Sequence, residues 1–152
     1  MNKYLIPIIF FISIIFAGCS SLHVESKEAS FKKYPNKVSL TNTYWKLTVL
    51  NGKAITQTQH NKREAHIVLN QGKVKGNSGC NGLGGKYILN DNKLSFSDKG
   101  FFTTRMFCKG SRENEFLNAL KNMHNYKITG EYLEIFDKDD VKLARFESVY
   151  LH

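Results

Sequence analysis

The stretch from Gly76 to Tyr87 constrains the fold of this chain more than any other. It reads GNSGCNGLGGKY and lies between two runs whose apolar residues predict β-strands. Glycines this dense are needed where the backbone adopts positive φ angles or passes close to another segment, and asparagine tolerates the same left-handed region. The stretch therefore predicts a tight, ordered corner between two strands.

The N-terminus has the layout of a secretory signal. A lysine precedes an apolar run from Leu5 to Phe16, which is about a dozen residues long, whereas a membrane-spanning helix needs roughly 20. The letters AGC that follow resemble the lipobox of bacterial lipoproteins, in which the cysteine carries the lipid. We expect residues 1–18 to be a lipoprotein signal peptide and Cys19 to be lipidated. The alternative is a conventional cleaved signal that leaves Cys19 as a thiol.

Residues 19–40 are polar and mixed in charge, with only scattered apolar positions. This composition predicts a lipidated, flexible tether, whose last turn signal is Pro35-Asn36. The serine after Cys19 is similar to the signal that sorts enteric lipoproteins to the outer membrane. We therefore expect a protein of the bacterial cell envelope that is anchored in the outer membrane, faces the periplasm, and folds over residues 41–148.

Two cysteines lie in the expected folded domain, Cys80 in the corner and Cys108 just before a helix pattern. In an exported protein, a pair of cysteines without other partners is usually oxidised. Lipid on Cys19 also leaves these two as an even pair among the three cysteines of the chain. We therefore predict a disulfide between Cys80 and Cys108.

The chain has a formal net charge of +9. A basic exported protein can lie on anionic lipid or anionic polysaccharide, but lysines spread along the chain are also what a solvated surface needs. We favour the solvated surface. Nucleic acid is not an expected partner, because the sequence has no motif for it and export places the protein in another compartment.

Apolar residues alternate along several segments, as they do in half-buried strands. Trp45, Leu47 and Val49 share one face of the first strand, and later runs of the same period are separated by turn residues. The segment from Phe101 to Cys108 is expected to be extended. We assign Phe101, Phe102 and Tyr132 to the core, and the alternative is that they form a binding face.

One segment has a helical period instead. Ser111 predicts the start of a helix from Arg112 to about His124, and Phe116, Leu117, Leu120 and Met123 form its apolar stripe. Together these patterns predict an α+β fold with one helix packed on a mainly antiparallel sheet of about eight strands. Such a sheet could close partly into a barrel.

Several motifs, in order along the chain, resemble the META domain. They are Trp45 with Leu47, Gly76-x-Ser78-Gly79-Cys80-Asn81 with Gly85-x-Tyr87, Thr103-Thr104-x-Met106-x-Cys108, Glu115-Phe116 with Leu120, and Tyr126-x-Ile128-x-Gly130-x-x-Leu133. Phe107 departs from the pattern, because the family often has a small residue there. The family includes the heat-shock protein HslJ and related bacterial envelope lipoproteins. The resemblance implies a paired Cys80 and Cys108 and a compact antiparallel β fold with a helix, but no known activity.

The sequence has no motif for catalysis or for metal binding. Its histidines are scattered without ligand spacing, and the adjacent carboxylates Asp139 and Asp140 fit a turn. We therefore expect no enzymatic activity, no metal and no cofactor. Polar groups at the corner are suited to recognition, and the candidate binding residues are Asn77, Ser78, Asn81, Lys86 and Tyr87. The alternative is that these residues only serve the backbone geometry of the corner.

We expect a monomeric, non-enzymatic binding or envelope-maintenance module that holds an envelope protein or a cell-surface component near the membrane. The alternative is a small inhibitor of a cell-wall hydrolase or protease, and a hydrolytic enzyme comes third. An inhibitor should expose a protruding rigid loop. A binding module should have a shallow groove or patch, and an enzyme a cleft in which titratable groups converge.

Overall fold

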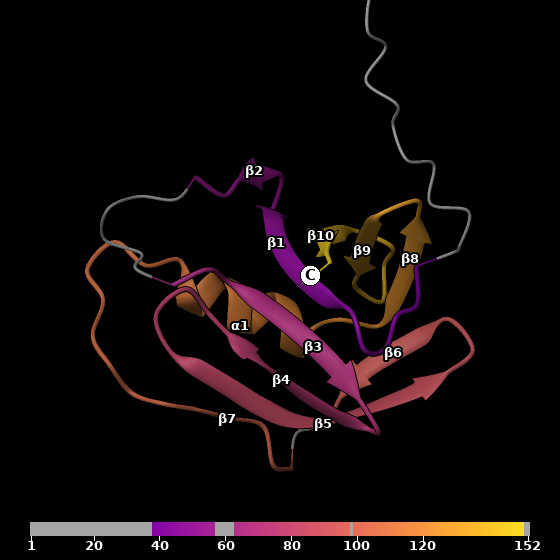
Figure 1. Ribbon diagram of the computed structural model, residues 1–152, viewed down its shortest axis with the longest axis horizontal. Helices are drawn as coiled ribbons and strands as arrows, with labels where there is room; N and C mark the ends of the chain where they lie inside the picture. The colour runs from indigo at the N-terminus through magenta and orange to yellow at the C-terminus, as the bar shows by residue number, and fades with distance from the viewer. Residues whose placement is uncertain (1–37, 57–62, 98, 151–152) are drawn as a thin grey trace, which may run out of the picture. The chain divides into compact units, whose positions relative to one another are not determined.

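The sheet closes on itself into an antiparallel barrel (Figure 1). The computed structural model describes residues 38–56, 63–97 and 99–150, so the predicted signal peptide, the lipidation site Cys19 and most of the tether lie outside the described residues. In the described part, ten strands form one sheet, and leaving aside the short strands β2 and β7 gives a ring of eight. The strands of the ring are β1 (Tyr44–Leu50), β3 (His66–Asn70), β4 (Lys73–Asn77), β5 (Gly82–Asn90), β6 (Lys93–Phe96), β8 (Asn125–Thr129), β9 (Tyr132–Phe136) and β10 (Lys142–Val149).

Pairing between the first and the last strand closes the ring. β1 and β10 are antiparallel from Tyr44 opposite Val149 to Leu50 opposite Ala144, and β10 continues the sheet to β9 and β8. The junction between β6 and β8 is much shorter, with one paired position. The prediction of a mainly antiparallel α+β fold is confirmed, and the closure is complete rather than partial.

A β-bulge in β1 changes which side chains face the core. The register against β10 shifts between Leu47 and Val49, so that Leu50 is fully buried and Val49 is only half-buried. A bulge inserts one extra residue into a strand and so reverses the facing of the residues that follow it. The expectation that Val49 shares the inner face with Trp45 was therefore wrong.

The helix α1 runs from Glu113 to Lys121 and is shorter than the predicted segment at both ends. The N-cap position is Arg112, although the Ser111 hydroxyl still accepts a hydrogen bond from the Glu113 N–H at 3.1 Å. The helix buries its apolar stripe in the barrel core through Phe116, Ala119 and Leu120, with Met123 following in the next turn. In the described ranges, no helix is long and apolar enough to cross a membrane.

Large apolar side chains fill the barrel interior. Those of Trp45, Phe116 and Phe146 are fully buried, and the Trp45 indole N–H donates to the Leu40 carbonyl at 2.9 Å. Val38 and Leu40 belong to the same core, so the folded part already includes residues that the sequence had assigned to the tether.

Two short strands lie beside the ring. β2 (Lys53–Ala54) pairs with the end of β1 and had no counterpart in the sequence prediction. β7 (Phe102–Thr103) pairs with the start of β5, where Thr103 lies opposite Leu83 and Phe102 opposite Gly84. The extended segment predicted from Phe101 to Cys108 is therefore a strand over two residues only. Beyond it, the Thr104 N–H still donates to the Gly82 carbonyl, but the Gly82 N–H donates to the Thr104 hydroxyl instead of to a main-chain carbonyl.

Candidate functional site

The corner between β4 and β5 is closed by its own side chains. The Ser78 N–H donates to the Asn81 carbonyl at 2.7 Å, and the Asn81 N–H donates back to the Ser78 hydroxyl at 2.8 Å. Gly79 has a φ of 94°, a conformation that favours glycine, and its N–H donates to the Asn77 side-chain oxygen at 2.8 Å. The predicted tight, ordered corner is confirmed, but it spans only the residues between the two strands.

Crowding explains other glycines of the stretch. A β-carbon on Gly76 would overlap the carbonyl oxygen of His66 on the facing strand, and one on Gly84 would lie 2.6 Å from the Phe102 ring. Both glycines lie within strands and have no positive φ. Their function is to let another segment approach closely.

Asn81 connects the corner to two distant segments. Its buried side-chain NH₂ group donates to the Met106 carbonyl at 3.0 Å and to a Glu113 carboxylate oxygen at 2.8 Å. Its side-chain oxygen accepts from the Met106 N–H at 2.7 Å and from the Thr104 hydroxyl at 2.8 Å. All four hydrogen-bonding positions of the amide are thus used. Asn81 pairs with both main-chain groups of Met106, as a neighbouring strand would.

The Ser78 hydroxyl is also committed inside the protein. Its oxygen lies 2.6 Å from the second Glu113 carboxylate oxygen and accepts the Asn81 N–H. Among the described residues, no histidine or lysine forms a hydrogen bond with this hydroxyl. The arrangement holds the start of α1 against the corner.

The predicted disulfide between Cys80 and Cys108 is present, with the two Cα atoms 5.9 Å apart. It ties the corner to the segment before α1 across a sequence separation of 28 residues. Cys108 is held further because its carbonyl accepts the Ser111 N–H at 3.1 Å. The corner and the segment from Thr104 to Glu113 therefore form one cross-linked unit.

This unit presents an exposed apolar tip, which we call the 105–109 loop. Phe107 is 93% exposed and Met106 is 50% exposed, and the basic residues Arg105 and Lys109 on either side are exposed as well. The loop is fastened at Met106 by Asn81 and at Cys108 by the disulfide. Phe107 thus lies between two fixed points, with its side chain almost entirely in solvent.

A second feature, which we call the outer groove, lies on the outside of β4 and β5. It has a volume of about 510 Å³. Three lysines and one aromatic ring are placed around a backbone floor that contains several glycines. The side chains that define the groove are Lys73, Lys75, Lys86 and Phe102. Phe102 is 65% exposed, and the far end of its ring lies over Gly84.

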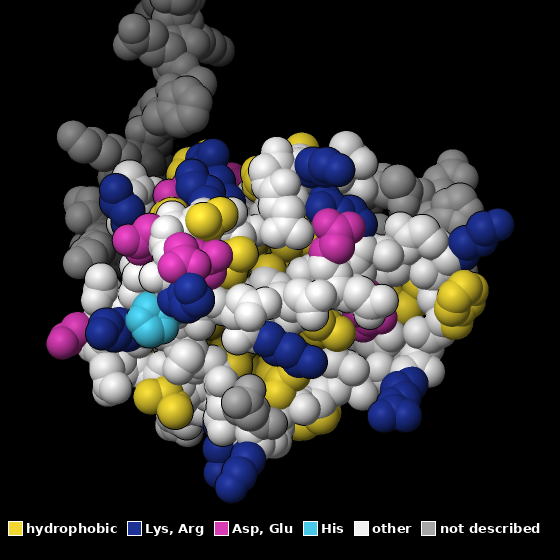
Figure 2. Space-filling model, turned by 180° about the vertical axis from the view of Figure 1, so that it is seen from behind, with side chains coloured by type: hydrophobic (Ala, Val, Ile, Leu, Met, Phe, Trp, Pro, Cys, Tyr) yellow, Lys and Arg dark blue, Asp and Glu magenta, His cyan; other side chains and the backbone are white. Residues whose placement is uncertain are grey.

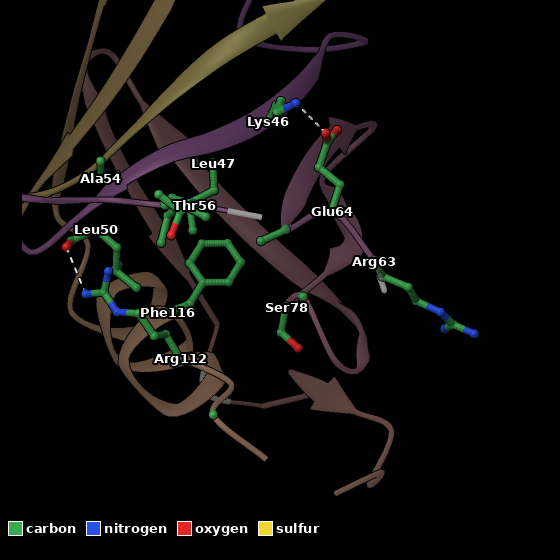
Figure 3. Close-up of a pocket in the computed structure, with 14 residues that line it drawn as sticks. Lys46, Leu47, Leu50, Ala54, Thr56, Arg63, Glu64, Ser78, Arg112 and Phe116 are labelled. Carbon is green, nitrogen blue, oxygen red and sulfur yellow. Dashed lines mark hydrogen bonds and ion pairs between the residues drawn. The ribbon is translucent and has the colours of Figure 1, made fainter. Parts of the chain in front are cut away.

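A third feature is a pocket of about 230 Å³ between β1, the start of α1 and the corner (Figure 3). Leu47, Leu50 and Phe116 give it an apolar lining. Lys46 at its rim is paired with Glu64 at 2.5 Å, and Arg63 extends away from the pocket (Figure 3). Because these three side chains are apolar, the pocket can accommodate an apolar group.

Charged neighbours and burial shift the pKa of groups close to this pocket. Burial, followed by the nearby Glu64 carboxylate, raises the pKa of Tyr44 to about 12. The hydrogen bond from Arg112 lowers the pKa of Glu115, and the Arg112 guanidinium also donates to the Leu50 carbonyl at 3.0 Å. These contacts join the first turn of α1 to the end of β1.

The structure separates the five candidate binding residues. The side chains of Asn77, Ser78 and Asn81 are buried and hydrogen-bonded within the corner, Tyr87 is half-buried, and Lys86 is exposed in the outer groove. That the corner surface binds a partner stays a prediction, and Lys86 is the member of the set that a partner can reach.

Two of the three aromatic residues expected in the core, Phe102 and Tyr132, are exposed instead. Phe101 packs against the core and stacks on Phe96 with ring centroids 5.7 Å apart, but Phe102 points outward. Tyr132, also expected in the core, is 38% exposed and lies under the Arg145 guanidinium. Adjacent residues in a strand face opposite sides, so Phe101 and Phe102 could not both be buried in a sheet with one solvated face.

Charge elsewhere on the protein is dispersed. On the face seen from behind, Lys and Arg side chains appear at several separate places (Figure 2). In the described part of the chain, no group of three or more His, Cys, Asp or Glu side chains could hold a metal ion.

The sequence model of the META domain matches residues 38–150. The chain belongs to the META domain family. The match covers the barrel and the helix, including both cysteines of the disulfide. No curated protein sequence matches this META domain chain.

Solved structures share the fold of this META domain. A protein from Burkholderia xenovorans, solved by NMR, is 23% identical with a TM-score of 0.59, and the match covers 78% of this chain and 99% of that one. Another NMR structure is 24% identical with a TM-score of 0.56, covering 72% of this chain and 95% of the other. A DUF4847 family protein from Bacteroides vulgatus is 15% identical with a TM-score of 0.54, covering 74% and 96%. These similarities establish the fold alone.

Proposed function

We propose that this META domain protein is a lipid-anchored binding module of the bacterial envelope, which faces the periplasm and holds a partner protein near the membrane without catalysing a reaction. The N-terminal signal pattern and Cys19 support the anchor. The observation that carries the binding function is the 105–109 loop, in which a rigid frame presents Phe107 to solvent.

An aromatic side chain on a fixed loop is well suited to recognition. Large aromatic residues that enter a partner's pocket supply much of the binding energy at protein interfaces. A loop that is ordered beforehand loses little conformational entropy on binding. The disulfide at Cys108 and the hydrogen bonds from Asn81 to Met106 supply this order. Arg105 and Lys109 add positive charge, which favours an acidic rim around the partner's pocket.

Site-specific crosslinking in cells tests the partner. A photoreactive benzoylphenylalanine in place of Phe107 should trap a defined envelope protein, whereas the same group in place of Val141 should not. Val141 is a matched control because it is an exposed apolar residue, 57% accessible, on the turn between β9 and β10. The same set of adducts at both positions would count against the loop as the binding site.

The anchor is tested separately. Cys19→Ser should abolish lipid attachment, which mass measurement of the mature protein detects, and should release the protein from the membrane fraction. A mature form that stays membrane-bound after this substitution would contradict the lipid anchor. Separation of inner and outer membranes then tests the expected outer-membrane location.

A second candidate function is inhibition of a cell-wall hydrolase or protease, and the protruding, cross-linked 105–109 loop favours it as well. An inhibitor of this kind would insert Phe107 into the active site of its target. The purified protein should then lower the activity of the crosslinked hydrolase in proportion to occupancy. Phe107→Ala should weaken that inhibition about tenfold or more, whereas Val141→Ala should leave it unchanged. A trapped partner without hydrolytic activity would leave the binding module as the function.

A further inference from the structure

We infer that the outer groove is a binding site for an anionic polysaccharide, whose carboxylate or phosphate groups contact Lys73, Lys75 and Lys86 while a sugar ring lies against Phe102. The groove is formed by β4, β5 and β7 and uses different residues from the 105–109 loop. This inference therefore goes beyond the proposed protein partner and does not depend on it.

Three positive charges are concentrated on this outer face. Lys73 and Lys75 alternate with buried Val74 on β4, and Lys73 lies directly opposite Lys86 on β5. Like charges directly opposite each other destabilise a sheet. Within the described part of the chain, none of the three lysine ammonium groups has an ion-pair or hydrogen-bond partner. A bound anion would offset the repulsion between these lysine ammonium groups, which no acidic side chain of the described sheet neutralises.

The spacing of the lysines suits a carbohydrate chain. Side chains two residues apart on a strand are about 7 Å apart, and neighbouring strands are about 5 Å apart. Three ammonium groups on this lattice therefore cover a patch of about the size of one or two sugar rings. The shallow groove between them has a floor of backbone, because the outward position opposite Lys75 is Gly84, which has no side chain.

Phe102 gives the groove an apolar edge. The ring leans across from β7 onto Gly84, its direct cross-strand partner, and 65% of the residue stays exposed. The face of an aromatic ring carries partial negative charge, which attracts the C–H groups on one side of a sugar ring. An aromatic ring beside three cations therefore matches a ligand with both an apolar face and anionic substituents.

The number of aromatic rings favours a polysaccharide over a nucleic acid. Single-stranded nucleic acids bind on several aromatic side chains, on which successive bases stack. In the described residues that line the outer groove, Phe102 is the single aromatic side chain. Binding in the groove should therefore depend mainly on the lysine charges, with Phe102 as the one position on which a ring can stack.

Binding to defined polymers tests this inference. Full-length protein, purified in detergent, is measured by affinity electrophoresis through gels that contain polygalacturonate, neutral dextran or oligothymidylate. Polygalacturonate should retard the protein and dextran should not. Substituting all three groove lysines, Lys73→Gln, Lys75→Gln and Lys86→Gln, should weaken binding about tenfold or more, because affinity for a polyanion falls with each lost cation contact.

A matched triple variant removes the same charge elsewhere. Lys93→Gln, Lys121→Gln and Lys127→Gln alter exposed lysines outside the groove and should change binding by less than about threefold. Phe102→Ala keeps every charge and should weaken binding about fivefold, the effect of one lost stacking contact. The melting temperature of each variant shows whether it is folded.

Three outcomes would overturn the inference. Equal weakening by the two triple variants would mean that only net charge matters. Equal retardation by dextran would remove the role of the anionic groups, and tighter binding to oligothymidylate would make nucleic acid the ligand. A failure here leaves the crosslinking result at Phe107 intact, since the groove lysines are not part of the loop.

Discussion

Removal of the Asn81 side chain should destabilise the domain more than removal of any other asparagine side chain in the described part of the chain. Asn81→Ala breaks four hydrogen bonds at once, two to the Met106 main chain and one each to Thr104 and Glu113. A neutral hydrogen bond contributes about 1 kcal/mol net, and a bond to a charged group about 1.5–3 kcal/mol. The bond to the Glu113 carboxylate is therefore the strongest of the four.

Exposure of the partners reduces this total. Met106 and Thr104 are exposed residues, so water can replace part of what they lose. We therefore expect a loss of about 3 kcal/mol in the free energy of unfolding, which is a large share of the 5–15 kcal/mol typical of a domain. The melting temperature should fall by about 10 °C. The Met106 amide should also exchange its hydrogen faster, because the Asn81 side chain that accepts it is gone.

Urea unfolding gives the free energy, and hydrogen exchange gives the local effect. Asn122→Ala is the matched control, since that side chain makes one exposed hydrogen bond, to the Asn118 carbonyl at 2.9 Å, and should cost less than about 0.5 kcal/mol. Asn81→Asp should be worse than Asn81→Ala at neutral pH, because it places a second carboxylate against Glu113.

The reasoning would be refuted by a stability loss below about 1 kcal/mol in Asn81→Ala together with unchanged exchange at Met106. That pair of results would mean that the disulfide alone holds the 105–109 loop in place. The loop would then not depend on the corner for its order.

Three further predictions concern stability. Replacing both Cys80 and Cys108 by serine should lower the free energy of unfolding by about 3.5 kcal/mol, because the disulfide closes a loop of 28 residues and so lowers the entropy of the unfolded chain. Alkylation of the unreduced wild-type protein should label neither cysteine. Labelling of both would exclude the bond. Gly76→Ala should cost about 3 kcal/mol of stability or prevent folding, because the new β-carbon overlaps the facing strand. In Gly82→Ala, the β-carbon would lie 4.0 Å from its nearest neighbour, the Thr104 methyl group, so the cost should be less than about 1 kcal/mol. Equal urea midpoints for the two variants would contradict this. The raised pKa of Tyr44 means that the folded state keeps its phenol proton longer than the unfolded chain, so the stability from this group is present below pH 10 and is lost between pH 10 and about pH 12. In thermal melts over that range, Tyr44→Phe should show a shallower alkaline decline than the wild type, and parallel declines would show that Tyr44 does not contribute.

Much of the fold followed from local pattern. Alternation in the first half of β1 and along β9, and the helical stripe of α1, reflect burial on one face, which constrains each residue within its own segment. Departures arose where a distant segment intervenes. The bulge in β1 moves Leu50 into the core, and the Thr104 hydroxyl bonds to the Asn81 side chain of the corner where a regular strand pair was expected.

The candidate binding site was less predictable. From the sequence, the polar residues of the corner could form either a recognition surface or hydrogen bonds within the protein. Their orientation depends on Met106 and Glu113, which are far away in the sequence. Lys73 and Lys75 were not among the candidate binding residues, although in the structure they alternate with the buried Val74 and face outward. The position of Phe102 above Gly84 depends on the pairing of β7 with β5 and has no local signal.

The sequence by itself determined the tight glycine corner, the disulfide, the antiparallel strands and the single helix of the described chain, because each depends on residue types that few other conformations accept. Tertiary structure alone decided the closure of the barrel, because β1 and β10 pair across nearly the whole described chain and no local pattern specifies a partner strand. It also decided which polar side chains are buried and which exposed. A buried amide such as that of Asn81 must find all its hydrogen bonds within the protein, and those partners come together only when the chain has folded.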